Sequence, residues 1–294
     1  MNIVELYELY KQYPSVQTDT RKLKQGDIFF ALRGPNFNAN AFAETALANG
    51  AVYAVIDDAT YNTHANMILV DDVLSTLQQL ALFHRNQFNI PFLAITGSNG
   101  KTTTKELIHA VLNTTYTTYT TEGNLNNHIG VPLTILKIRS DAQMAVIEMG
   151  ANHRGEIASY CVYARPDHGL ITNVGKAHLE GFGGYEGVRK GKGELFDHLR
   201  SCKGTVFVMN DYDYLKEMSA GIENRFTYGT HDADVTGSIV ESEPFLSVAF
   251  EDFTISTQLV GAYNLPNVLA AVAVGTYFNV PAETIKKAIE GYTT

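Results

Sequence analysis

The chain has 294 residues, of which 45% are hydrophobic and 18% charged, and its formal net charge is −9 at pH 7. This length predicts two domains, and the negative charge excludes a general nucleic-acid or membrane-surface binder, because such proteins need a basic surface. The N-terminus lacks the features of a signal peptide, and no stretch reaches the ~18 apolar residues of a membrane helix, so we expect a cytoplasmic protein. Cys161 and Cys202 show no metal-site spacing, so we expect both to be free thiols.

Residues 1–89 are expected to form a small α/β domain. A first helix is predicted over residues 3–13, because apolar side chains share one helical face: Ile3, Leu6, Leu9, Tyr10 and Tyr13. Short strands are predicted at residues 28–32, 52–56 and 67–70. Helices are predicted at residues 41–49, before Gly50, and from Asp71 or Asp72 to about Phe88.

The segment Asn89-Ile90-Pro91 is the predicted domain boundary, because proline cannot continue a helix. Beyond it, apolar strands at residues 92–96, 144–147, 169–172 and 205–209 alternate with helices, which predicts a mostly parallel sheet covered on both faces. Residues 235–258 alternate as antiparallel strands do, and residues 265–278 and 281–290 predict two helices. The expected fold class is therefore α/β, with a small N-terminal domain and a central domain that includes an antiparallel segment.

The segment from Ile95 to Thr104 predicts a phosphate-binding loop between a strand and a helix. Gly97 and Gly100 permit positive φ angles, so the backbone N–H groups and the helix N-terminus can approach an anion. Lys101 would supply positive charge, and the Thr102 hydroxyl suits Mg²⁺. The loop is shorter than the ordinary G-x-x-x-x-G-K-[ST] pattern, so the alternative is a plain turn with a surface lysine.

Three polar residues lie at or beyond the ends of predicted strands, where open α/β sheets bind ligands. Glu148 ends one strand, Asn173 ends the next, and His178 lies in the loop beyond it. Glu148 could share a hard cation with Thr102, although a helix-capping or ion-paired acid is the alternative. A lone histidine is usually structural or exposed.

Lys192 lies in the segment Gly187–Phe196, for which composition favours a solvated basic turn. The alternative is a buried lysine whose lowered pKa gives a neutral amine. Such an amine can add CO₂ and become a carbamate, which is an anionic oxygen ligand for Mg²⁺.

Six ordered segments together resemble the Mur ligase family: Thr96–Glu106, Thr121–Leu136, Val146–Ile157, Thr172–Gly183, Lys190–Phe196 and Gly261–Ala271. Thr18–Arg21 and Gly26–Gly34 are similar to the uridine-nucleotide-binding part of the family. The resemblance implies a UDP-binding domain over residues 1–89 and an ATP-binding domain over residues 90–294. It also implies a third, Rossmann-like C-terminal domain, which we do not expect within these residues, so we expect the chain to be truncated and inactive alone.

The resemblance also assigns roles to individual residues. ATP would contact Gly97, Ser98, Asn99, Gly100, Lys101, Thr102, Thr103, Asn264 and Asn267. Metal would be held by Thr102, Glu148, His178 and Lys192 as a carbamate, and catalytic roles would fall to Lys101, His178 and Lys192. The substrate would contact Thr20, Arg21, Asn124, Asn126 and Asn127. Asn38-Ala39-Asn40 stands where the family usually carries Asp-Gly-His, so contacts to uridine or sugar are not carried over there.

The segments GNLNNHIG and EMGANHRGEI favour the D-alanyl-D-alanine-adding branch of the family. That branch implies an ATP- and Mg²⁺-dependent amide ligase of peptidoglycan synthesis that acts through an acyl phosphate. Its partners would be UDP-N-acetylmuramoyl-tripeptide and D-alanyl-D-alanine, with no nucleic acid and no membrane insertion, and we expect a monomer. The alternatives are a sibling that adds diaminopimelate or lysine, and a nucleotide-binding module without activity.

Overall fold

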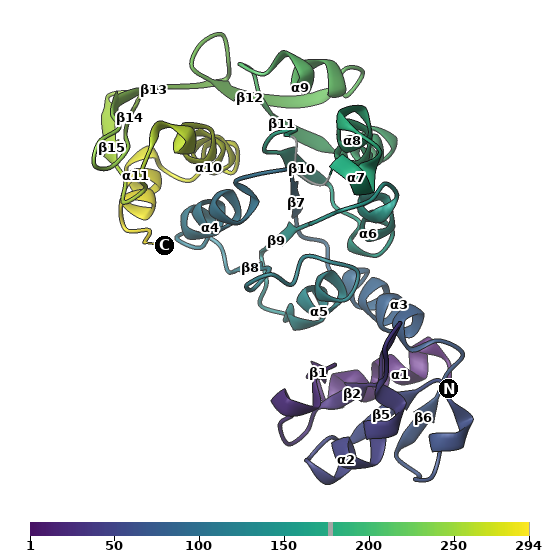
Figure 1. The fold of residues 1–294 in the computed structure, drawn as a ribbon. Coiled ribbons are helices and arrows are strands. Elements are labelled where there is room, and N and C mark those ends of the chain that lie inside the picture. Colours follow the sequence, from purple (N-terminus) through teal and green to yellow (C-terminus); the bar gives the residue numbers. More distant parts are fainter. Residues whose placement is uncertain (176–178, 294) are drawn as a thin grey trace. The chain divides into compact units, whose positions relative to one another are not determined.

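The computed structural model describes residues 1–175 and 179–293, and the chain divides into two compact units (Figure 1). Unit 1 comprises Met1–Asn89, His128–Arg139 and Val162–Ala164. Unit 2 comprises Ile90–Asn127, Ser140–Cys161 and Arg165–Thr294. Unit 1 thus also contains a helical segment that the sequence analysis placed in residues 90–294. No described helix is both long and apolar enough to span a bilayer.

Unit 1 is built on a parallel four-stranded sheet of order β1-β2-β5-β6. Its strands are β1 (Val16–Gln17), β2 (Ile28–Phe30), β5 (Tyr53–Ile56) and β6 (Met67–Leu69), and a hairpin pairs β3 (Arg33–Gly34) with β4 (Phe37–Asn38). Its helices are α1 (Ile3–Gln12), α2 (Ala43–Ala48), α3 (Val73–Arg85) and α5 (Gly130–Lys137), with short turns η1 (Thr20–Lys22), η2 (Ala39–Phe42) and η3 (Ala59–Tyr61).

Helix α1 begins where its sequence provides a capping box. Asn2 Oδ1 accepts a hydrogen bond from Glu5 N, at 3.0 Å, and the Glu5 carboxylate accepts one from Asn2 N, at 2.9 Å. The buried face of α1 carries Leu6, Tyr7 and Tyr10. The predicted face omitted Tyr7, whose ring centroid lies 4.8 Å from that of Phe83 on α3. The two helices therefore pack through aromatic contacts.

Unit 2 is built on a nine-stranded sheet of order β15-β14-β13-β12-β11-β10-β7-β9-β8. The pairs from β8 to β13 are parallel, and β13, β14 and β15 are antiparallel, which confirms the predicted fold class. The strands are β7 (Phe92–Thr96), β8 (Thr118–Thr120), β9 (Met144–Glu148), β10 (His168–Ile171), β11 (Thr205–Met209), β12 (Asn224–Gly229), β13 (Val235–Glu241), β14 (Ser247–Phe250) and β15 (Phe253–Ser256).

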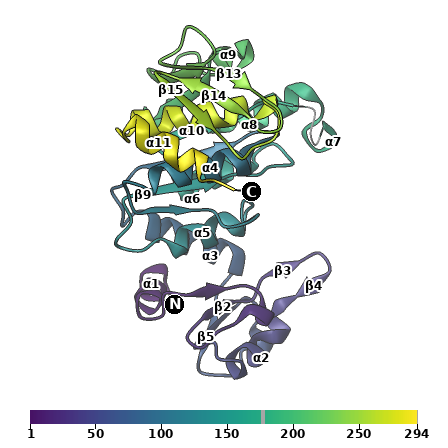
Figure 2. The ribbon, with the colours of Figure 1, turned by 90° about the vertical axis from the view of Figure 1, so that its left-hand side faces the viewer.

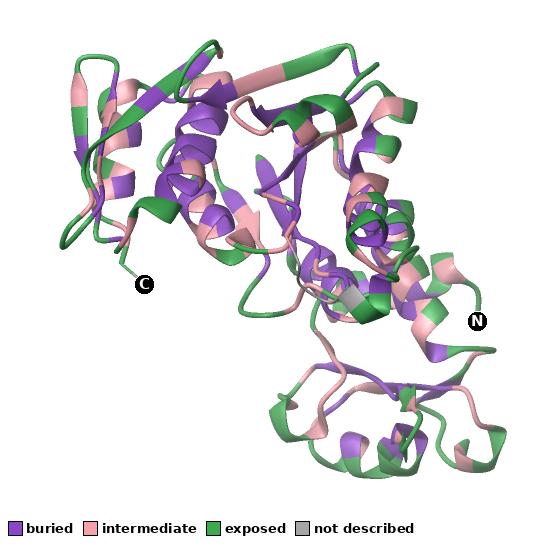
Figure 3. Cartoon of the chain, turned by 45° about the horizontal axis from the view of Figure 1, so that its top comes forward, coloured by how far each residue is buried: buried purple, intermediate pink, exposed green. Residues whose placement is uncertain are grey.

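Helices cover both faces of this sheet, as Figures 1 and 2 show. One face carries α4 (Lys101–Leu112), α10 (Leu265–Tyr277) and α11 (Ala282–Glu290), and the other carries α6 (Glu156–Ala164) and α8 (Tyr185–Cys202). The remaining elements of unit 2 are α7 (Leu179–Phe182), α9 (Asp213–Met218) and η4 (Ala262–Asn264). The central strands are buried, as the purple ribbon in Figure 3 shows, which explains their continuous apolar sequence.

The strand order determines where polar side chains can gather. Strand β7 lies between β10 and β9, and all three are parallel, so their carboxyl ends meet at one edge of the sheet. Thr96, Glu148 and Ile171 end these strands. The loop that follows β7 therefore lies between the residues that follow β9 and β10, where open α/β sheets bind ligands.

Replacement of Leu77 by alanine tests the packing of unit 1. Leu77 lies on α3 and is 0% exposed, so we expect Leu77→Ala to lower the free energy of unfolding by about 2–5 kcal/mol. Leu74 on the same helix is only partly buried, so Leu74→Ala should cost less. Urea unfolding monitored by circular dichroism measures both values. Equal losses for the two variants would contradict the assigned packing of α3.

Candidate functional site

The loop of residues 97–100 joins β7 to α4 and requires glycine at two positions. Gly97 has a φ of +147° and Gly100 a φ of +75°, a backbone region that other residues rarely adopt. A Cβ atom at Gly97 would lie 1.9 Å from Thr172 Oγ1, and one at Gly100 would lie 2.6 Å from Asn267 Oδ1. Close contact with neighbouring segments thus adds to the backbone requirement.

Hydrogen bonds fix this loop to the residues that follow β10. Ser98 N donates to Asn173 O, and Asn99 N donates to Asn173 Oδ1, both at 3.0 Å. Thr172 Oγ1 donates to Asn99 O at 2.6 Å, and Gly175 N donates to Ser98 Oγ at 2.8 Å. The N–H groups of Ser98 and Asn99 thus already have partners, whereas the N–H groups in the first turn of α4 lack intrahelical acceptors and can face an anion.

Lys101 is the first residue of α4, and its side chain folds back over the loop. Its Nζ atom donates to Gly97 O at 2.9 Å and to Ser98 O at 3.3 Å. Burial lowers the pKa of this ammonium group, and the nearby Glu148 carboxylate opposes that shift. Lys101 is therefore a partly buried cation at the loop and not the surface lysine of the alternative interpretation.

Glu148 ends β9 and is 1% exposed. Its Oε1 atom accepts hydrogen bonds from Asn126 Nδ2, at 2.7 Å, and from Thr102 Oγ1, at 3.3 Å. Its main-chain N–H donates to Thr121 Oγ1 at 3.0 Å. Its Oε2 atom is buried and has no hydrogen-bond partner among the described residues. An unpartnered buried carboxylate oxygen is costly unless another group satisfies it.

The oxygens of Glu148 and Thr102 fit the coordination chemistry of Mg²⁺. This ion prefers oxygen ligands, and it commonly binds through one or two protein groups together with substrate phosphates. The described residues contain no cluster of three or more His, Cys, Asp or Glu side chains that could hold a metal by themselves. The site therefore suits an ion shared with a phosphate-bearing ligand. His178, the predicted nitrogen ligand, lies outside the described residues.

Lys192 lies on α8 and is 2% exposed, so the composition-based prediction of a solvated basic turn is wrong. Its Nζ atom donates to Ala151 O at 3.0 Å. Burial lowers the pKa of Lys192 to about 8; the charge of Lys101 adds to this shift, and Glu156 and Glu194 oppose it. About one tenth of this amine is therefore uncharged at pH 7, far more than for an exposed lysine.

A polar cleft of about 270 Å³ brings several predicted site residues together. It is lined by Gly97, Ser98, Lys101, Asn124, Asn126, Asn127, Gly150, Ala151, Asn152, Glu156, Tyr160 and Lys192. The phosphate loop, the Asn-rich segment and the buried lysine thus face one space. That space has two lysine side chains, which favour an anionic ligand.

A second cleft of about 600 Å³ also borders the loop, and it contains the predicted adenine contacts. Asn267 Oδ1 accepts a hydrogen bond from Thr104 Oγ1, at 3.0 Å, and Asn267 Nδ2 donates to Asn264 Oδ1, at 2.9 Å. Asn99, Gly100, Thr103, Asp211, Tyr212, Tyr214 and Tyr263 also line the cleft. Aromatic rings and amides in one cavity suit a nucleobase.

Two residues near the site were missed by the sequence analysis. Lys105 is 0% exposed and donates from Nζ to Thr121 O at 2.5 Å. Glu194 on α8 accepts hydrogen bonds from Gly155 N, at 2.6 Å, and Ala158 N, at 2.9 Å, so it caps the start of α6. The resemblance segments TTTKE and KGKGELF contain these two residues, which is a signal that they share the site.

In unit 1, the predicted uridine contacts Thr20 and Arg21 lie on η1. The exposed Arg21 pairs with Asp19, with Nη2 and Oδ2 2.8 Å apart, and its hydrogen bonds lower the pKa of Asp19 to about 2. Asn40, at the departure from the family pattern, is 1% exposed and donates from Nδ2 to Asp57 Oδ1 at 2.8 Å. Asn40 therefore has a structural role in unit 1.

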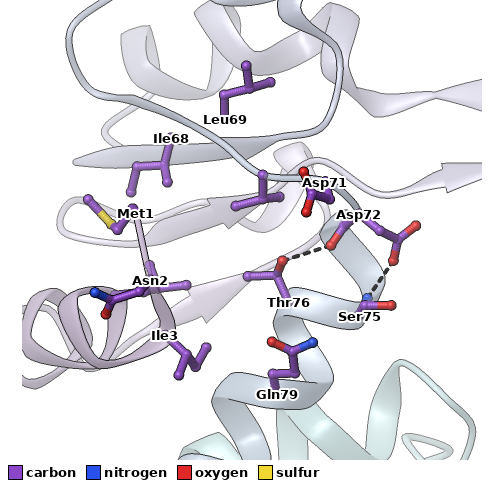
Figure 4. Close-up of a pocket in the computed structure, with 12 residues that line it drawn as sticks. Met1, Asn2, Ile3, Ile68, Leu69, Asp71, Asp72, Ser75, Thr76 and Gln79 are labelled. Carbon is purple, nitrogen blue, oxygen red and sulfur yellow. Dashed lines mark hydrogen bonds between the residues drawn. The ribbon is translucent and has the colours of Figure 1, made fainter.

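Unit 1 also has a hollow of about 430 Å³ between the first residues of the chain and the segment that follows β6 (Figure 4). Asp72 caps α3 there: its Oδ1 accepts from Ser75 N at 2.6 Å, and its main-chain O accepts from Thr76 Oγ1 at 2.7 Å. Asp71 and Asp72 make this hollow acidic, which disfavours a phosphate-bearing ligand.

The sheet, the glycine loop and the sheet-edge carboxylate define an α/β protein of the phosphate-loop class. A family model described as "Mur ligase middle domain" matches residues 95–275. The chain belongs to the Mur ligase family.

The chain is similar to several proteins and solved structures of this family. It is 36% identical over 280 residues to the UDP-N-acetylmuramoyl-tripeptide--D-alanyl-D-alanine ligase of Bacillus subtilis, covering 94% of this chain and 61% of that protein. It matches crystal structure I of MurF from Acinetobacter baumannii with a TM-score of 0.85 and 32% identity, over 95% of this chain and 63% of that one. It matches MurF ligase from Thermotoga maritima in complex with ADP with a TM-score of 0.83 and 28% identity, over 95% and 66% of the two chains. The chain thus spans about 61% of the length of its Bacillus subtilis relative.

The burial of Lys192 predicts a pH-dependent contribution to stability. The pKa of Lys192 is about 8 in the folded chain against an ordinary value of 10.5, so the unfolded chain binds more protons between these values. Stability should therefore rise with pH in this range. Relative to Lys192→Met, the wild type should gain about 2 kcal/mol of unfolding free energy from pH 7 to pH 10.

Denaturant unfolding in carbonate-free buffer measures this difference. Lys190 lies on the same helix but is exposed, so Lys190→Met should follow the wild type across the pH range. A constant difference between wild type and Lys192→Met would mean that Lys192 is not desolvated in the folded chain.

Proposed function

We propose that this chain is the ATP-binding and UDP-substrate-binding part of a cytoplasmic amide ligase of peptidoglycan synthesis. The ligase would add D-alanyl-D-alanine to UDP-N-acetylmuramoyl-tripeptide. The similarity to ligases with this name supports the choice of substrates. The observation that carries the proposal is the buried Oε2 atom of Glu148, which has no partner in the described part of the chain and whose carboxylate lies beside Thr102 at the start of the phosphate-loop helix.

In this proposal, the two domains bind different ligands. Residues 1–89 would bind the uridine nucleotide, with Thr20 and Arg21 contacting it. Residues 90–294 would bind ATP, with the phosphates at residues 97–103 and the adenine near Asn264 and Asn267. The cleft at the loop would receive the peptide end of the UDP substrate, facing Asn124, Asn126 and Asn127.

The proposed reaction has two steps. The terminal carboxylate of the tripeptide attacks the γ-phosphorus of ATP, and ADP leaves, which gives an acyl phosphate. The amine of D-alanyl-D-alanine then attacks the acyl carbon and loses a proton, and phosphate leaves from the tetrahedral intermediate as the amide forms. Lys101 and the N–H groups at the start of α4 would stabilise the charge on the transferred phosphoryl group.

Mg²⁺ fits the oxygens of Thr102 and Glu148, and when bound it would neutralise charge on the phosphates. His178 and Lys192 are proposed as further ligands by resemblance, Lys192 as a carbamate. The lowered pKa of Lys192 supports carbamate formation, because the uncharged nitrogen can attack the carbon of CO₂ and release a proton. Detection of the added CO₂ mass on a peptide containing Lys192, after chemical trapping, tests this step.

Two alternatives are separated by direct assays. A sibling ligase would turn over with diaminopimelate or lysine in place of D-alanyl-D-alanine, so a panel of amine acceptors distinguishes the two. A nucleotide-binding module would bind ATP but release no ADP when both substrates are present. We propose a monomer, and size-exclusion chromatography with light scattering tests that oligomeric state.

Replacement of Lys101 tests the proposed site. In the complete ligase, Lys101→Ala should lower the rate of ADP release at least ~10²-fold, because one preorganised charge at the phosphates is lost. Lys190 is an exposed lysine on α8, so Lys190→Ala should keep the wild-type rate. The rate of ADP release in the presence of both substrates is compared among the wild type and the two variants. Normal turnover by Lys101→Ala would overturn the proposed role of the loop.

A further inference from the structure

Asn126 belongs to the Asn-rich segment that follows β8, and the resemblance assigns this segment to substrate contacts. In the structure, its amide is directed at another protein side chain. Asn126 Nδ2 donates to Glu148 Oε1 at 2.7 Å, which is shorter than the 3.3 Å from Thr102 Oγ1 to the same oxygen. The amide is therefore the nearer of the two donors to the carboxylate.

The backbone holds Asn126 in this position from both sides. Its main-chain O accepts a hydrogen bond from Gly150 N, at 2.8 Å, and its N–H donates to Asn124 O, also at 2.8 Å. Gly150 leaves room for the amide, because a Cβ atom there would lie 2.8 Å from Asn126 Oδ1 and 2.9 Å from Asn126 Cγ. The amide therefore packs directly against the segment that follows Glu148.

The two oxygens of Glu148 consequently have different surroundings. Oε1 accepts from both Asn126 and Thr102, whereas the buried Oε2 has no partner among the described residues. The main chain is fixed as well, since Glu148 N donates to Thr121 Oγ1, and Thr121 O accepts from the buried Lys105. A tilt of the carboxylate plane would break the Asn126 hydrogen bond, so this bond fixes the orientation of the carboxylate while its second oxygen keeps no partner among the described residues.

We propose that Asn126 is a positioning residue for Glu148: its amide holds Oε1 and thereby orients Oε2 toward a Mg²⁺ ion that accompanies the nucleotide. This inference rests on the proposed function, because it requires a metal–nucleotide site at Glu148. It changes the expected role of Asn126 from substrate contact to orientation of a metal ligand. Groups that orient metal ligands typically contribute about 10–100-fold to metal affinity.

The test separates metal binding from nucleotide binding. Isothermal titration calorimetry measures the affinity of the 294-residue chain for ADP, first in EDTA and then across a series of MgCl₂ concentrations. Asn126→Leu keeps a similar side-chain size but removes the donor, and Asn126→Ala removes the whole amide. The Mg²⁺ midpoint is the MgCl₂ concentration at which half of the change in ADP affinity has occurred. Both variants should raise this midpoint about 10–100-fold. Affinity for ADP in EDTA should change less than about twofold, since the orienting bond acts only through the metal.

Two further variants make the test specific. Glu122 is exposed in the same segment but does not line the cleft, so Glu122→Gln should leave the Mg²⁺ midpoint unchanged. Gly150→Ala keeps Asn126 but would displace its amide, so it should raise the midpoint as Asn126→Leu does. This second route keeps the inference testable if an Asn126 variant folds poorly, which urea unfolding would reveal.

The outcomes distinguish this inference from the proposed function. If the wild-type chain binds no ADP, or binds it without any effect of Mg²⁺, the proposed function fails before any variant is compared. If wild-type binding depends on Mg²⁺ but folded Asn126→Leu and Gly150→Ala keep the wild-type midpoint, only the positioning role is overturned. A raised Michaelis constant for the UDP substrate with an unchanged Mg²⁺ midpoint would return Asn126 to substrate binding.

Discussion

The structure buries the carboxyl group of Glu148 almost completely, and the site is organised around that constraint. Glu148 is 1% exposed, and burying such a group is unfavourable unless hydrogen bonds or a cation compensate. The fold supplies donors to Oε1 from Thr102 and Asn126 and leaves Oε2 without a partner among the described residues. An oxygen left without a partner in this way indicates a ligand site, because the large majority of buried polar atoms are hydrogen-bonded.

Helix α4 connects the parts of the site through side chains in its first two turns. Lys101 contacts the loop, Thr102 contacts Glu148, Thr104 contacts Asn267 in the second cleft, and Lys105 contacts Thr121. One rigid element thus sets the spacing between the cleft that holds the predicted adenine contacts and the cleft that holds the Asn-rich segment. A displacement of α4 along its axis would alter both clefts together.

Much of the fold and part of the site follow from local sequence rules. The strand at residues 92–96, the glycine loop and the meeting of Thr102 with Glu148 were predictable, because parallel strand ends share one edge. The burial of Lys192 was not, since glycines 187, 191 and 193 hide the helical character of α8. Gly187 is required by tertiary packing: a Cβ there would lie 1.7 Å from Phe182 O. The bond from Asn126 to Glu148 depends on how a loop packs, which periodicity does not encode.

The fit between Gly97 and Thr172 has a consequence for how such sequences can diverge. The space that a Cβ atom at position 97 would need is already filled by the Thr172 hydroxyl, which itself holds the loop through Asn99. A relative with any larger residue at position 97 must therefore have rebuilt the end of β10 as well. Substitutions at positions 97 and 172 are therefore coupled, although the two residues lie 75 positions apart in the sequence.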